Sequence, residues 1–374
     1  MTTVTVICFI VCYALFTGVL RLGWKQQVRK SQLIDKSEKL YDIKVSIIVP
    51  CRNEEAMIGR LLDRLITMLP HKSLEILCVD DHSTDNTASI IKKVENVKYI
   101  SLSEFAKGKK AAIEEGIRQA TGDVILVTDA DCFPDEYWLE RMTNPFLSPQ
   151  IHMVCGWVRM NGQGFVFSEL VSLEFSTMVA LSAAMSGWNK PVLCNGASLA
   201  FRKESFMQVG GYSSDKAASG DDVFLMHKFK SRFGKHTVHY MLQSGAGVET
   251  MAPNTWNTFI KQRIRWARKS VLYRDFDTIF LSLFILLVHG WLLGWFIVSW
   301  FEPHYWIVFS LSWLGKSICD VWWVGTYAST LKQEHWSWFV LPLCMIHWLY
   351  IPFMALLSQL VPSPEWKGRT WING

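Results

Sequence analysis

The sequence of 374 residues has little charge: only 19% of its residues are charged, and 50% are hydrophobic. Its nine cysteines include no CxxC pair, so the sequence indicates neither a disulfide framework nor a paired-cysteine zinc site. Several of these cysteines lie in apolar runs, where cysteine behaves as a small hydrophobic residue. This usage is typical of a protein in a reducing compartment.

Familiar nucleotide and nucleic-acid signatures are also missing. The sequence has no GxxxxGK[ST] loop and no zinc-finger or RNA-binding motif. The net charge is only +5, and basic residues gather without acids in two stretches, 21–30 and 261–274. Both stretches border apolar segments, which favours an anionic lipid surface over nucleic acid as a partner. Of the 18 Trp residues, 12 follow residue 278, as expected where a chain meets membrane interfaces.

Four apolar segments have the length of a membrane span. The first, residues 3–20, is followed by basic residues and shows no cleavage site, which predicts an uncleaved anchor within residues 1–24 rather than a signal peptide. A helix buried inside the protein is the alternative. The other segments, within a C-terminal region 278–361, are 279–300, 305–327 and 338–361. The middle one contains Lys316 and Asp320, whose spacing of four lets them neutralise each other on one helix face.

These spans predict a multi-pass protein of the plasma membrane, with residues 43–250 in the cytoplasm. One span before this domain and three after it would place Lys367 and Arg369, in the tail 362–374, outside. That placement runs against the positive-inside rule. We therefore expect one segment to be re-entrant or interfacial.

Residues 43–250 have the pattern of an α/β domain. Short apolar runs at 45–50, 74–79, 97–102 and 124–128 predict buried strands. Between them, residues 58–66, 84–94 and 109–120 have helical spacing. This alternation predicts a doubly wound parallel sheet, in which ligands bind at the carboxyl ends of the strands.

Acidic pairs follow two of these predicted strands. Asp129 and Asp131 are two residues apart, so in an extended segment their carboxylates point the same way and suit a hard divalent cation. An ordinary turn is the alternative, because aspartate is common in turns. Asp80 and Asp81 end another strand, where one carboxylate can accept hydrogen bonds from a base or ribose.

Three further features suit a transfer reaction. Lys109 opens a helix after a glycine, which makes an anion site or, alternatively, a solvated basic turn. Asp221 and Asp222 open another helix, where one aspartate can cap the helix and the other can act as a general base. Residues 251–277 form an amphipathic interfacial segment, on which Arg265 could reach a phosphate and Trp266 could stack on a sugar.

Taken together, the sequence resembles family 2 glycosyltransferases, which have the GT-A fold. The resemblance spans residues 43–270 and rests on segments in the family's order. These are VSIIVPCRNEE, VDDHSTDNT, GKKAAIEEGI, GDVILVTDADC, NGASLAFRKESFMQVGGY, SGDDVFL and QRIRW.

The resemblance implies an α/β fold with a Rossmann-like mixed sheet plus transmembrane helices, and a metal-dependent inverting transfer of sugar from a nucleotide sugar, UDP-linked. It implies that Asp131, with Asp129, binds Mg²⁺ or Mn²⁺. Asp222 would be the catalytic base, but the segment reads GDD instead of the family's commoner ED, so Asp221 is a candidate too. The donor would contact Pro50, Arg52, Glu54, Asp80, Asp81, Lys109, Asp129, Gln262, Arg265 and Trp266, the last three through the QxxRW motif.

The acceptor is less well defined by the sequence. The few C-terminal spans and the Ala267-Arg268-Lys269 that follows QRIRW favour a single transfer to a lipid-like or membrane-associated acceptor. A processive polysaccharide synthase and a non-catalytic membrane scaffold with the same fold are the alternatives. A transporter is disfavoured, because one Lys–Asp pair is too short a polar pathway.

Overall fold

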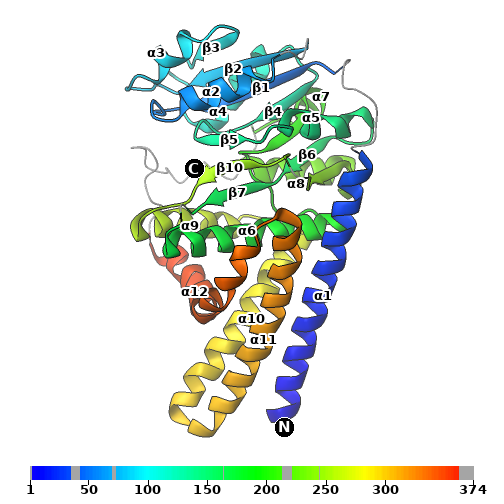
Figure 1. Cartoon of the computed structure of the whole chain (residues 1–374), viewed down its shortest axis with the longest axis vertical. Coiled ribbons are helices and arrows are strands. Elements are labelled where there is room, and N and C mark those ends of the chain that lie inside the picture. The colour runs from blue at the N-terminus through cyan, green and yellow to red at the C-terminus, as the bar shows by residue number, and fades with distance from the viewer. Residues whose placement is uncertain are drawn as a thin grey trace. The chain divides into compact units, whose positions relative to one another are not determined.

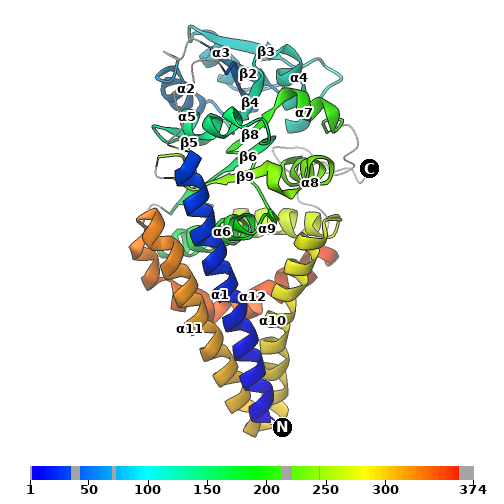
Figure 2. The same ribbon diagram turned by 90° about the vertical axis from the view of Figure 1, so that its right-hand side faces the viewer.

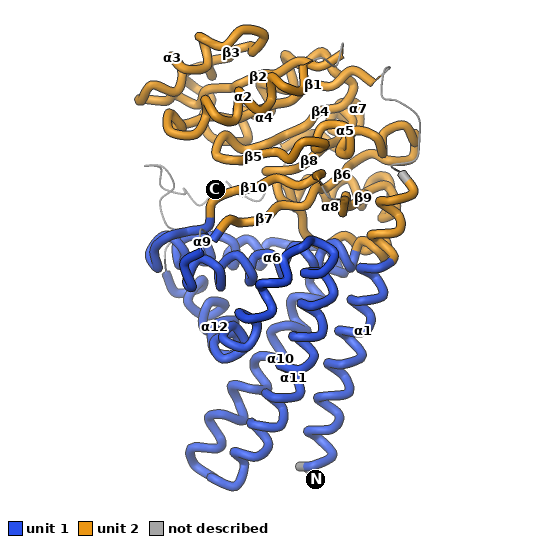
Figure 3. Tube along the Cα trace, in the orientation of Figure 1, with its two compact units in different colours: residues 1–25, 162–185, 252–372 blue, residues 26–161, 186–251, 373–374 orange. Residues whose placement is uncertain are grey.

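The computed structural model describes residues 2–34, 43–69, 73–162, 164–212, 221–243 and 245–361. The chain divides into two compact units (Figure 3). Unit 1 comprises residues 1–25, 162–185 and 252–372, and unit 2 comprises residues 26–161, 186–251 and 373–374. The predicted tail, with Lys367 and Arg369, lies outside the described residues, as does the segment 213–220 before Asp221.

Unit 2 is built on a seven-stranded sheet in the order β3-β2-β1-β4-β8-β6-β9 (Figure 1). The first four strands in this order are parallel, as the sequence predicts. They are β1 (Val45–Cys51), β2 (Leu74–Asp80), β3 (Val97–Ser101) and β4 (Val124–Val127). β1, β2 and β4 are mostly buried, as expected for parallel strands inside a sheet, whereas only Ile100 is buried in the edge strand β3.

The rest of the sheet departs from a wholly parallel arrangement. β8 (Leu199–Arg202) is antiparallel to both of its neighbours, β4 and β6 (Met153–Gly156). β9 (Val238–Met241) then pairs parallel with β6. The sheet is therefore mixed, as the family resemblance implies. A second sheet has the order β5-β10-β7, with β5 Cys132–Pro134, β10 Val248–Met251 and β7 Val158–Asn161.

The helices of unit 2 follow the predicted pattern, with small shifts at their ends. α2 (Ile58–Ile66) buries its predicted apolar face, and α4 (Lys109–Gln119) follows Gly108, whose φ of 97° suits glycine. Gly116 of α4 lies so close to β1 that a Cβ there would be 2.7 Å from Ile48 Cγ2. The others are α3 Thr87–Lys92, α5 Trp138–Thr143, η1 Asn144–Leu147, α7 Lys203–Gln208, α8 Asp221–Phe233 and η2 Lys235–Thr237.

The N-terminal helix α1 (Thr2–Ile34) is longer than the predicted span, and its last part belongs to unit 2. There the side chains of Gln27 and Ser31 both donate to the backbone carbonyl of Tyr240, at 2.6 and 3.1 Å. Lys30 donates to the carbonyl of Gly187 at 2.9 Å, so this basic residue is engaged by the protein. The end of α1 thus packs against β9.

Unit 1 consists of helices, and its α6 (Val166–Gly187) was not predicted as a span. Five helices in the described residues are long and apolar enough to cross a membrane, and the segment 166–187 is the second of them. In both views α6 and α9 (Trp256–Ser270) lie across the direction of α10 and α11 (Figures 1 and 2). The other helices are α10 Phe276–Phe301, η3 Pro303–Tyr305, α11 Trp306–Leu331, η4 Glu334–Trp338 and α12 Val340–Leu360.

Polar contacts join the first part of α1 to the C-terminal helices. Lys316 and Asp320 of α11 pair at 2.5 Å, which confirms the predicted neutralisation. The hydroxyl of Tyr13 also donates to Asp320, at 2.6 Å, and the ring of Phe16 lies 4.5 Å from that of Phe284. α1 therefore packs against both α10 and α11 (Figure 2).

Candidate active site

Those predicted donor residues that belong to unit 2 lie near the ends of its parallel strands. Cys51, the last residue of β1, is in register with Asp80, the last residue of β2. On the other side of β1, β4 ends at Val127, and Asp129 follows two residues later. The carboxyl ends of neighbouring parallel strands lie at the same edge of a sheet. Asp80 and Asp129 are therefore at the same edge.

Lys109 and Asp129 form an ion pair at this edge. They come from the start of α4 and from the segment after β4, and both side chains are about 30% exposed, at 29% and 30%. The backbone N–H of Gly108 also donates to the carboxylate of Asp81, at 3.0 Å. Three predicted residues are thus connected around the N-terminus of α4, where helix dipole and lysine together favour an anion.

The sequence did not decide which of Asp80 and Asp81 would face a ligand. In the structure, Asp80 has a structural role. Its Oδ1 accepts from the backbone N–H of Ser83 at 3.2 Å and from the Ser83 hydroxyl, and its Oδ2 accepts from Tyr99 at 3.1 Å. This buried carboxylate therefore holds the turn after β2. Asp81 is equally buried, and its carboxylate accepts from the N–H of Gly108, the residue before Lys109.

The segment after β1 is held in a strained turn. Asn53 has a φ of 51°, and its side-chain oxygen accepts from the backbone N–H of Thr84 at 2.8 Å. Arg52 donates to the backbone carbonyl of Asp81 at 2.9 Å, and the N–H of Glu54 donates to Thr87 at 2.8 Å. These bonds tie the two strand ends together. Pro50, the sixth residue of β1, is half-buried beside them.

Asp222 lies at the start of α8, with its carboxylate oriented by two backbone donors. Its Oδ2 accepts from Gly196 at 2.8 Å and its Oδ1 from Val223 at 2.9 Å. A Cβ on Gly196 would be 3.4 Å from Lys109 Nζ and 3.7 Å from Asp222 Oδ2. Lys109 and Asp222 therefore converge on one point beside Gly196, although 113 residues separate them in the sequence. The side chain of the alternative base, Asp221, lies outside the described part of the structure.

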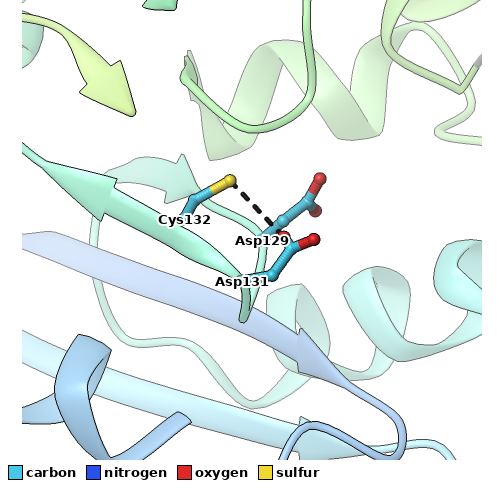
Figure 4. Close-up of side chains that lie close together, drawn as sticks. All are labelled: Asp129, Asp131 and Cys132. Atoms are coloured by element: carbon cyan, nitrogen blue, oxygen red, sulfur yellow. Dashed lines mark hydrogen bonds between the residues drawn. The ribbon is translucent and has the colours of Figure 1, made fainter. Parts of the chain in front are cut away.

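Asp129, Asp131 and Cys132 bring three ligand atoms within 4.8 Å of one another (Figure 4). Cys132 is buried, and its Sγ donates to Asp131 at 3.5 Å. Burial, and then the charges of Asp129 and Asp131, raise the pKa of this thiol well above its usual value. A thiol whose pKa is raised is a poor metal ligand, so the oxygen donors of this group are the two carboxylates. This donor set fits Mg²⁺ or Mn²⁺, which prefer oxygen ligands and share them with substrate phosphates.

The three QxxRW residues lie on α9 in unit 1, whereas all the other predicted site residues lie in unit 2. Gln262, Arg265 and Trp266 are all half-buried. On this helix the apolar Trp256 is 63% exposed, whereas the charged Arg263 is 4% exposed. Arg263 is buried because it is paired with Glu174 of α6. Sequence reasoning missed this pair, although an acid in an apolar helix is a signal for a partner.

The comparisons with known proteins agree with this fold. Residues 46–210 match the family described as Glycosyl transferase family 2. Among solved structures, the mannosyltransferase PcManGT from Pyrobaculum calidifontis, in complex with GDP-Man and Mn²⁺, has a TM-score of 0.51 at 17% identity. The match covers 94% of this chain and 98% of that one, and it shows the GT-A fold.

Two curated relatives have similar sequences over most of the domain. A poly-beta-1,6-N-acetyl-D-glucosamine synthase of Staphylococcus epidermidis is 27% identical over 279 residues, which is 70% of this chain and 65% of the relative. The probable glycosyltransferase YdaM of Bacillus subtilis is 27% identical over 237 residues, 60% of this chain and 54% of that one. The chain thus spans between about half and two thirds of these relatives.

Fold and sequence together support a glycosyltransferase. Residues 46–210 match glycosyl transferase family 2, the α/β domain has the GT-A fold, and the described chain also contains several apolar helices.

Proposed function

We propose that this protein transfers a hexosyl group from a nucleotide sugar, UDP-linked, to a hydroxyl of a membrane-held acceptor, with inversion at the sugar. The observation that carries the proposal is the convergence of Lys109, paired with Asp129, and Asp222 on one point beside Gly196. A cation for the diphosphate and a carboxylate for the acceptor hydroxyl are the two groups that a single displacement requires.

In this proposal the donor lies along the edge formed by the ends of β1, β2 and β4. Arg52 and Asp81 border the nucleotide, with Pro50 and Glu54 on the same turn. Lys109 and the N-terminus of α4 attract the diphosphate. Asp129 and Asp131 would hold a divalent cation, which when bound neutralises charge on the departing diphosphate.

The chemical step is a displacement at the anomeric carbon. The acceptor oxygen bonds to that carbon as its proton passes to Oδ2 or Oδ1 of Asp222, and the bond from the carbon to the diphosphate oxygen breaks. Lys109 stabilises the negative charge that gathers on the leaving group. The Gly196 and Val223 N–H groups keep the Asp222 carboxylate in one orientation during transfer.

A membrane location for the acceptor is supported by the five apolar helices. We propose that the catalytic domain lies on the cytoplasmic side, where nucleotide sugars are made, and that Gln262, Arg265 and Trp266 of α9 contact donor diphosphate and acceptor. Basic residues on this amphipathic helix suit an anionic lipid surface.

The proposal is tested with purified protein and a panel of nucleotide sugars, with and without Mn²⁺ or Mg²⁺. We expect one donor to be hydrolysed in a metal-dependent way, more slowly than it is transferred once an acceptor is added. UDP-N-acetylglucosamine stands first in the panel, because the Staphylococcus epidermidis relative is named for a polymer of that sugar. No turnover of any donor, with or without membrane lipid, would favour the scaffold alternative and contradict the proposal.

A processive polysaccharide synthase is the second candidate, favoured by the same relative's name. Product length separates the two functions. A single-transfer enzyme gives one sugar per acceptor at any donor excess, whereas a processive enzyme gives a ladder or a long polymer early in the reaction. Mass spectrometry of the lipid extract and gel analysis of the aqueous phase report both outcomes.

A further inference from the structure

Unit 1 contains a buried ion pair next to the QxxRW motif. Arg263 of α9 and Glu174 of α6 are 4% and 6% exposed, and the guanidinium donates twice to the carboxylate. The Nε–Oε1 bond is 3.3 Å long, and Nη2 donates to Oε2. Such a two-bond arrangement fixes the plane of the guanidinium as well as its position.

The same guanidinium contacts two of the three motif side chains. Its Nη1 donates to the side-chain oxygen of Gln262 at 2.6 Å. Its central carbon lies 4.4 Å from the ring centre of Trp266, which suits a cation–π contact. Trp266 also packs on Phe175 of α6, with 5.8 Å between ring centres.

A third helix meets the pair. The ring of Tyr350 on α12 stacks against Phe259, with 5.8 Å between ring centres, and the centre of the Phe259 ring lies 4.8 Å from the Arg263 guanidinium. Arg263 is thus surrounded by α6, α9 and α12 and has little freedom to move.

We infer that Arg263, held by Glu174, is a positioning residue that fixes Gln262 and Trp266 for their contacts with substrate. This inference rests on the proposed function of the motif. Because the oxygen of Gln262 accepts from Arg263, the group that Gln262 offers a ligand is its NH₂. Two N–H donors suit the acceptor-rich oxygens of a diphosphate or a sugar.

Stability alone is a weak reason for this pair, since well-packed apolar residues can replace a buried ion pair without loss. Apolar replacements would, however, release both Gln262 and Trp266. The position of Arg263 between the two motif residues therefore gives the pair a function that packing does not supply.

A double-mutant cycle on the full-length protein in detergent or lipid tests the inference. Gln262→Ala, Arg263→Lys and the double variant are compared by kcat and KM for the donor. Lysine keeps the charge beside Glu174 but lacks the fork that reaches Gln262 as well. We expect Arg263→Lys to lower kcat/KM about tenfold. The loss should appear in kcat or in the donor KM, whichever of the two Gln262→Ala changes. The double variant should be no worse than the poorer single variant within about twofold, because the two side chains act as one unit.

Lys316→Gln is the matched control, since Lys316 is an ion-paired cation equally buried in the same unit, at 3% exposed. It should lower the unfolding temperature and leave the donor KM unchanged. Multiplicative losses in the double variant, wild-type kinetics in Arg263→Lys, or the same kinetic loss in Lys316→Gln would each overturn the inference. Wild-type kinetics in Gln262→Ala would overturn it too. The proposed function is judged separately, by whether the wild-type protein turns over a nucleotide sugar at all.

Discussion

The carboxylate of Asp222 accepts a hydrogen bond of 2.8 Å from the backbone N–H of Gly196. This bond joins the N-terminus of α8 to the loop that precedes β8. The ammonium group of Lys109, whose partner is Asp129, lies near the same glycine, since a Cβ on Gly196 would be 3.4 Å from Lys109 Nζ. The group that would take a proton and the group that would hold a diphosphate are thus both next to Gly196.

Gly196→Ala should impair transfer while leaving the fold intact. The added methyl would be 3.4 Å from Lys109 Nζ and 3.6 Å from Asp222 Cβ, which are ordinary contacts that need no rearrangement. It would nevertheless occupy the point on which the two groups converge. We expect kcat/KM to fall about tenfold or more, with a shift in unfolding temperature below about 3 °C.

Gly59→Ala is the control for this change. Gly59 lies on α2, and a Cβ there would be 3.7 Å from Ile90 Cγ2 on α3, with no contact to Lys109 or Asp222. Equal activity in the two alanine variants would show that the space beside Gly196 is not used.

Asp131→Asn should weaken metal-dependent binding of UDP by at least about tenfold, because one of two carboxylates that would hold the cation is lost. Calorimetric titration of UDP with Mn²⁺ and with EDTA measures the effect. EDTA should bring the wild-type protein to the affinity of the variant. Glu136→Gln removes an exposed carboxylate on the same segment outside the metal group and should bind like the wild-type protein. Unchanged binding in Asp131→Asn would remove this residue from the metal site.

The stability of unit 2 should decrease as the pH is lowered, because of His239 on β9. Burial, and then the charge of Lys30, lower the pKa of this imidazole to about 4. The unfolded chain takes up the proton near pH 6.5, so between that pH and about 4 only the unfolded state is protonated. Stability from this residue is complete above about pH 6.5 and falls by on the order of 1.4 kcal/mol per pH unit below it.

Unfolding midpoints at several pH values between 7.5 and 5 measure this dependence. His239→Gln should flatten the curve in that window, whereas His236→Gln, which changes an exposed imidazole, should not. The same slope in His239→Gln and in the wild-type protein would assign the pH dependence to other groups.

Much of unit 2 could be predicted from local sequence. The run at 45–51 is buried and apolar, and the helix after it has strict helical spacing, so β1 and α2 are where the pattern places them. The gathering of Lys109 and Asp129 at one edge of the sheet also follows from the pattern of parallel strands, but their ion pair was not predicted. The antiparallel β8 did not follow, because strand direction depends on long-range pairing that periodicity does not record.

The helices of unit 1 show what local pattern misses. α6 has enough apolar residues for a span, but it contains Glu169 and Glu174. These two acids make the segment look like an ordinary helix of the α/β domain. Glu174 is tolerated because Arg263 neutralises it, and Arg263 comes from 89 residues further along the chain. The burial of either charge can be explained only once its partner is known.

The most direct test of the account is a paired measurement on Asp222→Asn: the rate of sugar transfer and the dissociation constant for the nucleotide-sugar donor. The asparagine keeps an oxygen for the Gly196 N–H but cannot take a proton. If Asp222 is the base, transfer should fall by about a hundredfold or more while donor affinity stays within about threefold of wild type. Transfer at the wild-type rate, or a loss explained wholly by weaker donor binding, would contradict the assignment of Asp222 as the base.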